Sequence, residues 1–250
     1  ISNTASIIRS PKAVVHVFIP HFAKYKIISI DGFAFDSCNI ESLTFAEDSE
    51  VITFKSNCLC DVHIKKLGIP ASLKNLQNGW CASLYDLTQI EISPNNRHFI
   101  FYNNQFLLGK SLESIDKFDI LHFALSHIEK AIIPPQISVI KTRSFFRHKN
   151  LKSVKFSPNT ELKQIGHYAF YESSIESLSL PASVEQIDEC CFSSTSNLRE
   201  VEISPENKRF KLIEGKYVVK ESQPGSGVFD VIIFARRDIE SVSILPSIKV

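Results

Sequence analysis

Apolar residues recur along this chain in a fixed series. An apolar residue is followed five positions later by a large apolar one, and then by an alternation of apolar and polar positions, as at Ile30, Phe35, Ile40, Leu43 and Phe45. The series begins again about every 22 to 25 residues, which is a period typical of stacked structural repeats. Its closing alternation predicts a short strand with one buried face.

Six such series are present, and they start at Ile30, Phe54, Leu76, Ile140, Ile165 and Ile187. One repeat of this size cannot bury its own apolar face, so consecutive repeats must stack, each contacting mainly the next. The sequence therefore predicts a β-rich repeat solenoid. Short parallel strands form one side, and irregular or short helical segments form the convex side.

The six repeats form two copies of a longer unit. Residues 91–99 read EISPNNRHF, and residues 202–210 read EISPENKRF, 111 positions later. The displacement keeps apolar positions while polar ones differ, as expected when side-chain volume matters more than identity. We expect copy one at residues 29–139 and copy two at residues 140–250, in a single continuous solenoid. Residues 1–28 would be the end of a preceding repeat or an N-terminal cap.

Each copy ends in an insert of about forty residues. HFIFYNNQFLL in copy one and RFKLIEGKYVV in copy two predict a strand, a tight turn and a second strand, with the turns at Asn103-Asn104 and Glu214-Gly215. A third strand is expected at FDILHFAL and at FDVIIFAR, after a loop that contains QPGSG in copy two. The inserts are therefore predicted to be two antiparallel β-meanders.

The repeats resemble a known family. IPASLKNLQNGWC, IGHYAFYESSIESLSLPASVEQIDECCF and the ISPENKRF-type step into a hairpin are similar to the BspA-like subfamily of leucine-rich repeats, over nearly all of residues 19–250. This family occurs in surface antigens of bacteria and parasitic protists, so the resemblance implies a leucine-rich-repeat solenoid with a recognition or adhesion role. Cys81 stands where the family has Phe, and Phe54 and Leu76 replace the usual Ile, which keeps these positions apolar.

Charge and composition argue against several classes of function. Of 250 residues, 44% are hydrophobic and 22% charged, as in an ordinary folded protein. The 28 basic and 27 acidic side chains nearly cancel, so no global field draws the chain to nucleic acid. The longest apolar run, near residues 118–125, is much shorter than the roughly 20 residues that span a bilayer. We expect no nucleic-acid partner and no membrane insertion by this segment.

The cysteines favour packing over chemistry. Cys58, Cys81 and Cys191 lie at or beside apolar repeat positions, where a thiol packs as a small hydrophobe. We therefore expect buried free thiols. Cys58, Cys60 and His63 offer a metal site as the alternative, but no fourth ligand is evident and the spacing matches no common zinc pattern. No cofactor and no metal are predicted.

Catalytic motifs are also missing. Within the two copies no histidine falls on a histidine of the other copy, and no G-x-S-x-G, H-E-x-x-H or glycine-rich phosphate loop occurs. The histidines are interpreted as solvated or partly buried, and the sequence predicts that the protein is not an enzyme.

The outward positions of the predicted strands form the candidate binding surface. They alternate with the buried positions and point away from the core, and solenoids commonly bind macromolecules on such a sheet. The candidate residues are Thr44, Lys66, Gln89, Glu91, Ser153, Lys155, Ser179, Glu200 and Glu202. The partner would be a protein or a glycan. The alternative interpretation is a solvated sheet face without a partner.

Two functional hypotheses remain open. The first is a non-enzymatic protein-interaction module, placed at the cell surface by the family resemblance. The second is an intracellular structural scaffold, because free thiols and the lack of an N-x-[ST] sequon favour a reducing compartment such as the cytoplasm. The chain contains no Met, and its final ILPSIKV matches IPPQISV, which leads into a further repeat in copy one. We therefore expect the native product to continue past Val250.

Overall fold

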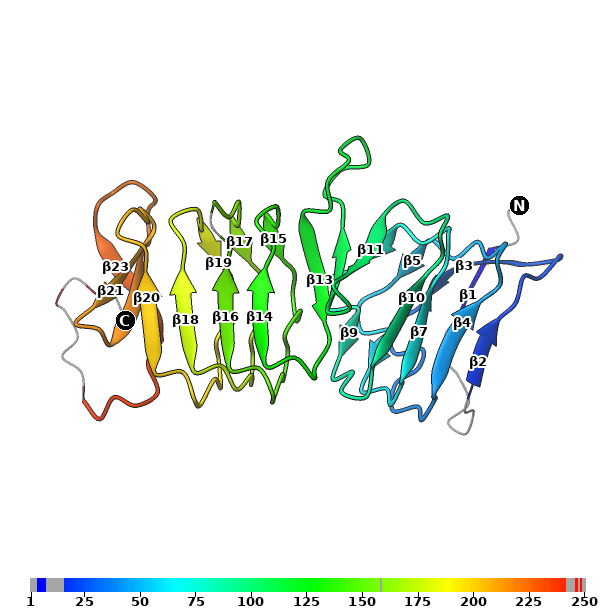
Figure 1. Ribbon diagram of the computed structural model, residues 1–250, viewed down its shortest axis with the longest axis horizontal. Helices are drawn as coiled ribbons and strands as arrows, with labels where there is room; N and C mark the ends of the chain where they lie inside the picture. The colour runs from blue at the N-terminus through cyan, green and yellow to red at the C-terminus, as the bar shows by residue number, and fades with distance from the viewer. Residues whose placement is uncertain (1–3, 8–15, 158, 242–245, 247, 249–250) are drawn as a thin grey trace. The chain divides into compact units, whose positions relative to one another are not determined.

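The computed structural model describes residues 4–7, 16–157, 159–241, 246 and 248, and it contains strands but no helix within these ranges (Figure 1). The chain divides into two compact units. Unit 1 comprises Ile1–His127 with Lys141–Ser144, and unit 2 comprises Ile128–Ile140 with Phe145–Val250. Both units are built from repeated parallel strands, which confirms the predicted β-rich solenoid fold. The expectation for the segment after Val250 lies outside the described residues, as do residues 1–3 and 8–15 of the segment 1–28 that was expected to end a preceding repeat or to form a cap.

One parallel sheet of unit 1 holds the strands that the alternation predicted, in the order β10-β7-β4-β2. These strands are β2 (His16–Ile19), β4 (Ser42–Phe45), β7 (Lys66–Ile69) and β10 (Gln89–Ile92). Leu43 is paired with Leu67, which is paired with Ile90. All three side chains are buried, so the sheet packs one face on the core and exposes the other.

A second parallel sheet lies on another side of the same repeats, in the order β1-β3-β5-β8. Its strands are β1 (Thr4–Ile7), β3 (Lys26–Ile30), β5 (Thr53–Phe54) and β8 (Asn75–Leu76), and a further parallel pair joins β6 (Leu59–Cys60) to β9 (Cys81–Ala82). Ile30, Phe54 and Leu76, the first residues of three successive series, are paired in register and buried. The sequence did not predict this sheet, because β5 and β8 contain only two residues each, too few to show an alternation.

Unit 2 repeats the arrangement, and Figure 1 shows its first sheet as a row of strands in the order β14-β16-β18-β20. These strands are β14 (Lys130–Ile133), β16 (Ser153–Phe156), β18 (Ser177–Leu180) and β20 (Glu200–Ile203). The second set is β15 (Val139–Ile140), β17 (Gln164–Ile165) and β19 (Gln186–Ile187), paired in parallel.

Aromatic stacking holds the repeats of unit 2 together. Phe145, Phe170 and Phe192 occupy the second position of successive series, and their ring centroids are 4.9 and 5.4 Å apart in stacked geometry. Offset stacking of this kind adds about 0.5–1.5 kcal/mol per pair beyond the burial of apolar area. In unit 1 the same positions hold Phe35, Leu59 and Cys81, which are buried without forming a ring stack.

The turns that follow the second sheet share one backbone conformation, with two left-handed residues four positions apart. The pairs are Phe33 and Ser37, Asn57 and Asp61, Gly79 and Ser83, Arg143 and Arg147, Tyr168 and Glu172, and Cys190 and Ser194. An L residue in this region costs roughly 1–2 kcal/mol, and glycine normally relieves that cost. The sequence left open whether these segments are irregular or short helices. The structure shows a non-helical turn that recurs from repeat to repeat.

Both predicted meanders are present. The first consists of β11 (Phe99–Tyr102), β12 (Phe106–Gly109) and β13 (Ile120–Ala124), and the second of β21 (Phe210–Ile213), β22 (Tyr217–Glu221) and β23 (Phe229–Ala235). Their strands pair in antiparallel order. Asn103 and Asn104 have φ values of 49° and 52°, and Glu214 and Gly215 have 50° and 67°. Two left-handed residues are what a type I′ hairpin turn requires.

One asparagine side chain in each copy explains a shared position of the repeated nonapeptide, at Asn96 and Asn207. Asn207 donates from Nδ2 to Pro181 O (2.8 Å) and Val184 O (3.2 Å), and its Oδ1 accepts from the amides of Arg209 (2.8 Å) and Phe210 (2.9 Å). Asn96 makes the four equivalent bonds to Pro70, Leu73, His98 and Phe99. The asparagine thus ties the repeat to the start of the meander in each copy.

Candidate functional site

The outward face of the first sheet in unit 1 brings four predicted site residues together. Its side chains form two rows across the strands, one with His16, Ser42, Lys66 and Gln89 and the other with Phe18, Thr44, Gly68 and Glu91. Thr44, Lys66, Gln89 and Glu91 therefore lie on one surface, as the sequence predicted.

A small polar network covers one edge of this face. Lys66 Nζ lies 2.8 Å from Glu91 Oε2, and Gln89 Nε2 donates to Glu91 Oε1 over 2.6 Å. The Thr44 hydroxyl donates to Val17 O (3.4 Å). Exposed ion pairs of this kind contribute about 0–1 kcal/mol to stability. The network therefore matters mainly because it neutralises the Glu91 carboxylate.

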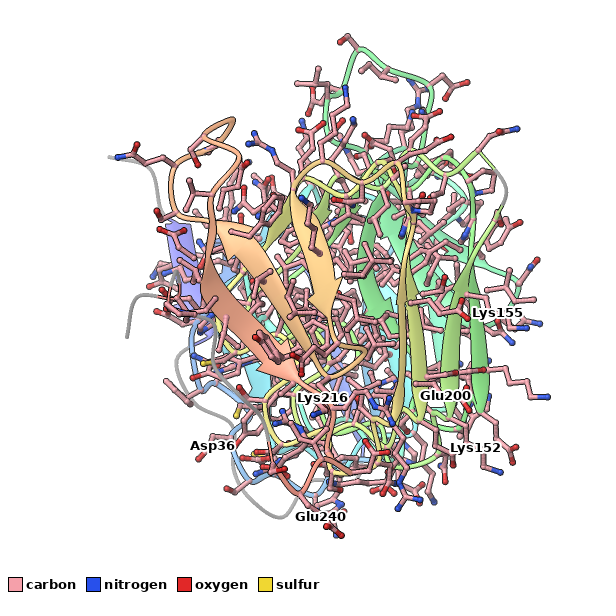
Figure 2. The ribbon with its side chains drawn as sticks, turned by 90° about the vertical axis from the view of Figure 1, so that its left-hand side faces the viewer. Asp36, Lys152, Lys155, Glu200, Lys216 and Glu240 are labelled. Atoms are coloured by element: carbon pink, nitrogen blue, oxygen red, sulfur yellow. The ribbon has the colours of Figure 1, made fainter. Side chains whose placement is uncertain are left out.

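Unit 2 presents the corresponding face with different charges. Its two rows are Lys130, Ser153, Ser177 and Glu200, and Ile132, Lys155, Ser179 and Glu202. All five predicted site residues of copy two lie here: Ser153, Lys155, Ser179, Glu200 and Glu202. Figure 2 shows Lys155 and Glu200 projecting from the same side of this sheet. Glu200 and Glu202 are both exposed, two positions apart on one face of β20.

Sequence reasoning missed the first strand of each face. Phe18 on β2 has 58% of its surface exposed, and Ile132 on β14 has 62%. Each is the neighbour of a predicted site position, because Phe18 pairs with Thr44 and Ile132 pairs with Lys155. The alternation in HVFI and KAII could have identified them, but these residues were assigned to a cap and to the end of an insert.

Each unit also has a groove where the strands of this face end. The groove of unit 1 has a volume of about 290 Å³ and that of unit 2 about 1030 Å³. The lining of the unit 1 groove recurs in unit 2 under the 111-residue displacement, wherever the counterpart is a described residue. The groove of unit 2 is also lined by residues without a counterpart in the unit 1 lining, among them Phe210–Ile213. Identical pairs include Phe45 and Phe156, Pro70 and Pro181, and Glu91 and Glu202. The duplication therefore preserved the groove together with the carboxylate at its edge.

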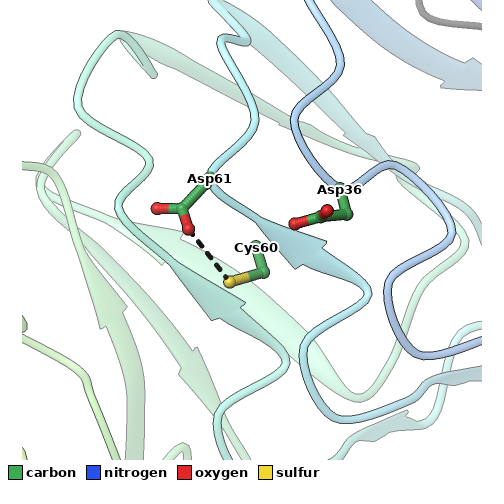
Figure 3. A group of neighbouring side chains, drawn as sticks. All are labelled: Asp36, Cys60 and Asp61. Carbon is green, nitrogen blue, oxygen red and sulfur yellow. Dashed lines mark hydrogen bonds between the residues drawn. The ribbon is translucent and has the colours of Figure 1, made fainter.

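A second cluster lies among the turns of unit 1. Figure 3 shows Asp36, Cys60 and Asp61, whose ligand-type atoms lie within 4.8 Å of one another. Cys60 Sγ donates to Asp61 Oδ2 over 3.6 Å. The metal alternative from the sequence is not supported, because Cys58 Sγ donates instead to a backbone carbonyl (3.4 Å) and His63 pairs with a different carboxylate (2.8 Å). Within the described ranges, Cys58 and His63 do not join a converging ligand set.

The chemistry of this cluster favours a protonated thiol. Burial and the neighbouring Asp61 raise the pKa of Cys60 to about 11, and the thiolate is the form that binds metals or attacks. The positive charge of Arg143 acts on the same thiol in the opposite direction. In copy two, Tyr171 and Glu172 stand at the equivalents of Cys60 and Asp61. The cluster is therefore specific to copy one.

The buried cysteines and histidines are likewise suited to packing. Cys58, Cys81 and Cys191 are buried, as the sequence predicted, and burial raises the pKa of each thiol. None of the six cysteines is in a disulfide. His122 is buried against Phe99, and burial lowers its pKa to about 3, so that its ring is neutral at physiological pH. No helix among the described residues is long and apolar enough to cross a membrane.

Comparisons with known proteins agree with this architecture. The pneumococcal vaccine antigen PcpA has a similar structure, with a TM-score of 0.62 and 18% identity over 79% of this chain and 52% of PcpA. A leucine-rich repeat protein from Eubacterium ventriosum has a TM-score of 0.57 and 16% identity over 83% of this chain and 61% of that protein. This chain thus spans about half to three fifths of their lengths. At these identities the likeness concerns the fold.

The sequence itself carries the family assignment. No curated protein sequence matches the chain. The family described as "BspA type Leucine rich repeat region (6 copies)" matches residues 19–121 and 116–214. The chain belongs to the BspA type leucine-rich repeat family.

Proposed function

We propose that this protein is a non-enzymatic recognition module that binds a macromolecular partner on the outward faces of its two parallel sheets. The observation that carries the proposal is the ordered double row of unburied side chains on each face, next to a groove that the duplication preserved. These rows combine small, charged and large apolar groups, which is the mixture found at protein interfaces.

A protein partner is favoured over a solvated face by the exposed apolar positions. Phe18 and Ile132 lie in rows of otherwise polar residues and expose more than half of their surface. An aromatic or aliphatic anchor with polar neighbours is the usual composition of an interaction hot spot. The names of the similar proteins include a vaccine antigen, which supports a surface-associated role.

The test replaces Glu91, Lys155 and Glu202 together with Ala. The chain, immobilised, is first used to capture and identify a partner, and the affinity of the purified partner is then measured for each variant. We expect the triple variant to lose about tenfold in affinity, roughly 1.4 kcal/mol. The control replaces Lys163, Glu185 and Glu189, which change the charge equally but lie outside both outward rows. Unchanged affinity in the first variant with intact folding would contradict the proposal.

The alternative is an intracellular structural scaffold, and the six thiols without a disulfide favour it. Location separates the two functions. Labelling of intact cells with a membrane-impermeant amine reagent should modify the exposed lysines if the protein is at the surface. Complete protection of the protein, with labelling after lysis, would favour the scaffold.

A further inference from the structure

A pocket of unit 1 lies where its second parallel sheet meets the first meander, and its volume is about 400 Å³. Its walls come from β8, the start of β11, the loop after β12, and β13, together with the short segment at residues 141–144 that belongs to the same unit. The titratable residues of the lining are Lys74, His98, Lys110, Glu113, His122 and Lys141. None of them belongs to the outward rows, so the pocket is separate from the proposed recognition faces.

The lining of this pocket carries an excess of positive charge. Three lysines and one glutamate are its charged residues, so the net charge of the described lining is +2 when the histidines are neutral. Glu113 is shared between two groups, since its Oε1 lies 3.5 Å from Lys74 Nζ and 4.0 Å from His98 Nδ1. The Glu113 side chain is 72% exposed, and exposed ion pairs contribute little to stability. An external anion can therefore compete with Glu113 for both groups.

The other two lysines reach the pocket from different segments. Lys110 follows β12, its side chain is only 13% exposed, and its Nζ lies 3.0 Å from Asp116, which is 99% exposed and outside the lining. The backbone amide of Lys141 donates to Leu121 O (2.9 Å), which holds this residue beside β13. Among the described residues, no carboxylate forms an ion pair with the half-buried Lys141 side chain. Lys141 is therefore a cation without an internal counterion.

The two histidines show that these cations converge on one cavity. Burial and the positive charges of Lys74 and Lys110 lower the pKa of His98. Burial and the positive charge of Lys141 lower the pKa of His122 to about 3. Both rings are therefore neutral at physiological pH, where each carries an N–H donor. The pocket combines three cations with neutral donors, which is a suitable environment for an anion.

The same pocket recurs in unit 2 with a different set of charges. It has a volume of about 340 Å³, and eight of its lining residues are counterparts of the unit 1 lining under the 111-residue displacement. Glu185 and Glu221 stand at the equivalents of Lys74 and Lys110, and Pro224 stands at the equivalent of Glu113. The cavity was retained while its two duplicated lysines correspond to acids, so the fold of the pocket does not require lysine at either position.

The carboxylates of the unit 2 pocket already have partners within the chain. Lys163 Nζ donates to Glu185 Oε1 over 2.7 Å. The Glu221 carboxylate accepts hydrogen bonds from the backbone amides of Gly225 and Gly227. Two basic and two acidic residues line this pocket, so its described lining has no net charge. The positive pocket is therefore a property of unit 1.

We propose that the pocket of unit 1 binds the phosphate group of a phosphate monoester, held by Lys74, Lys110 and Lys141, with Glu113 displaced from Lys74. A phosphate monoester carries a charge of about −1.5 to −2 at pH 7 and three strong acceptor oxygens, which matches the net charge and the donors of the lining. A sulfate ester has a single negative charge and balances only part of the lining. The pocket has room for about ten water volumes of roughly 30 Å³ each, so it also holds part of the group that carries the phosphate.

The experiment measures the binding of glucose 6-phosphate to the whole chain by isothermal titration calorimetry at pH 7.5. Glucose 6-sulfate and glucose have the same organic part and serve as comparisons. We expect glucose 6-phosphate to bind at least fivefold more tightly than glucose 6-sulfate, and glucose not to bind at millimolar concentration. The affinity for the phosphate should fall as sodium chloride is added, because salt screens charges that are accessible to solvent.

The two copies provide matched variants. Lys141→Gln removes the cation that has no counterion and should weaken glucose 6-phosphate by about fivefold. Lys74→Glu introduces the residue that unit 2 has at Glu185 and should weaken it at least tenfold. Glu113→Gln removes the competing carboxylate and should strengthen binding about twofold or more. Lys163→Gln changes the net charge as Lys141→Gln does, but in unit 2, and should leave binding unchanged.

The His98 ring reports binding at the site itself. Its proton resonances are identified in NMR spectra by their loss in His98→Gln. Saturation with glucose 6-phosphate should raise the pKa of His98, because a nearby dianion favours the charged ring. Circular dichroism and the thermal midpoint check that each variant is folded.

Several results would overturn this assignment. They are an absence of glucose 6-phosphate binding at millimolar concentration, equally tight binding of glucose 6-sulfate, equal effects of Lys141→Gln and Lys163→Gln, and an unchanged pKa of His98 at saturation. The outward faces contribute no residue to the pocket, so any of these results leaves the proposed recognition function unaffected.

Discussion

The amide of Asn96 provides the sharpest test of how the repeats are joined to the meanders. Asn96→Ala removes two donated bonds, to Pro70 O (2.7 Å) and Leu73 O (3.0 Å), and two accepted bonds, from the amides of His98 (2.8 Å) and Phe99 (3.0 Å). Each intramolecular hydrogen bond contributes about 0.5–1.5 kcal/mol net. Because Asn96 is only half-buried, water can replace part of this network. We expect a loss of about 2–4 kcal/mol in the free energy of unfolding.

Urea unfolding followed by tryptophan fluorescence measures this loss within the affected unit. Trp80 is the single tryptophan of the chain, it is 2% exposed, and it belongs to unit 1 as Asn96 does. With a urea dependence of about 2 kcal/mol per molar, a loss of 3 kcal/mol moves the midpoint by roughly 1.5 M. The fluorescence transition reports unit 1 even if unit 2 unfolds separately.

The neighbouring residue supplies the control, and an isosteric change separates bonding from packing. Asn95 is exposed, and Asn95→Ala should change stability by about 0.5 kcal/mol or less. Asn96→Asp keeps an acceptor for the two amides but turns an oxygen towards the carbonyls of Pro70 and Leu73, so it should destabilise nearly as much as Ala. The reasoning is refuted if Asn96→Ala costs no more than Asn95→Ala, or if Asn96→Asp matches the parent protein.

Three further predictions follow from burial and backbone geometry. Alkylation of the native, unreduced protein should modify the exposed Cys190 much faster than the buried Cys58, Cys81 and Cys191. After denaturation, all six thiols should be alkylated, and mass spectrometry that finds two or more disulfides would contradict this prediction. Ser194 has a φ of 59°, so Ser194→Gly should raise stability by about 0.5–1 kcal/mol in thermal unfolding, whereas Ser196→Gly, at a residue without left-handed φ, should lower it or leave it unchanged. Because burial lowers the pKa of His122 to about 3, the folded state favours the neutral ring. The stability that this group contributes is therefore complete above about pH 6.5 and is lost as the pH falls towards 3. His122→Leu should flatten this pH dependence of the free energy of unfolding, measured by urea titration.

The first sheets and the hairpins could be predicted because their signals are local. Leu43 and Phe45 show the alternation of a half-buried strand within four residues. The residue types of Glu214-Gly215 mark the hairpin turn between β21 and β22. The second sheet could not be predicted in this way, because β5 and β8 contain two residues each. Their pairing is imposed by the stacking of neighbouring repeats.

The repeated left-handed turns were hidden for a different reason. Residues such as Phe33 and Tyr168 carry no preference for positive φ, and a sequence gives warning of such a turn mainly through glycine or asparagine. The turn is held by inter-repeat bonds, such as that from the Phe33 amide to Asn57 O (3.1 Å). Of the left-handed turn positions, Asn57 and Gly79 carry these residue types, whereas most of the others do not, because the conformation there is maintained by the next repeat.

The sequence predicted which residues lie on the outward face, but it did not predict how their charges interact. Alternation alone assigned Lys66 and Glu91 to the outward face, and it gave no information on their separation. The strand register brings their charged atoms to 2.8 Å across one strand pair. The groove of unit 2 could not be predicted, because it is formed where the ends of three parallel strands meet the first strand of a meander. The spacing of these segments along the sequence does not show that they lie together.

The two kinds of conserved residue in the duplicated nonapeptide have different physical causes. Asn96 and Asn207 are explained by four bonds each to the backbone, so folding alone accounts for their retention. No such bond is seen for Glu202 among the described residues, and the Glu202 side chain is exposed on the same face of β20 as Glu200. Position 177 holds serine where unit 1 has Lys66, so an ion pair of the kind made by Glu91 does not explain why Glu202 is the same residue. A carboxylate at this position in both copies is expected if it acts on a group outside the chain.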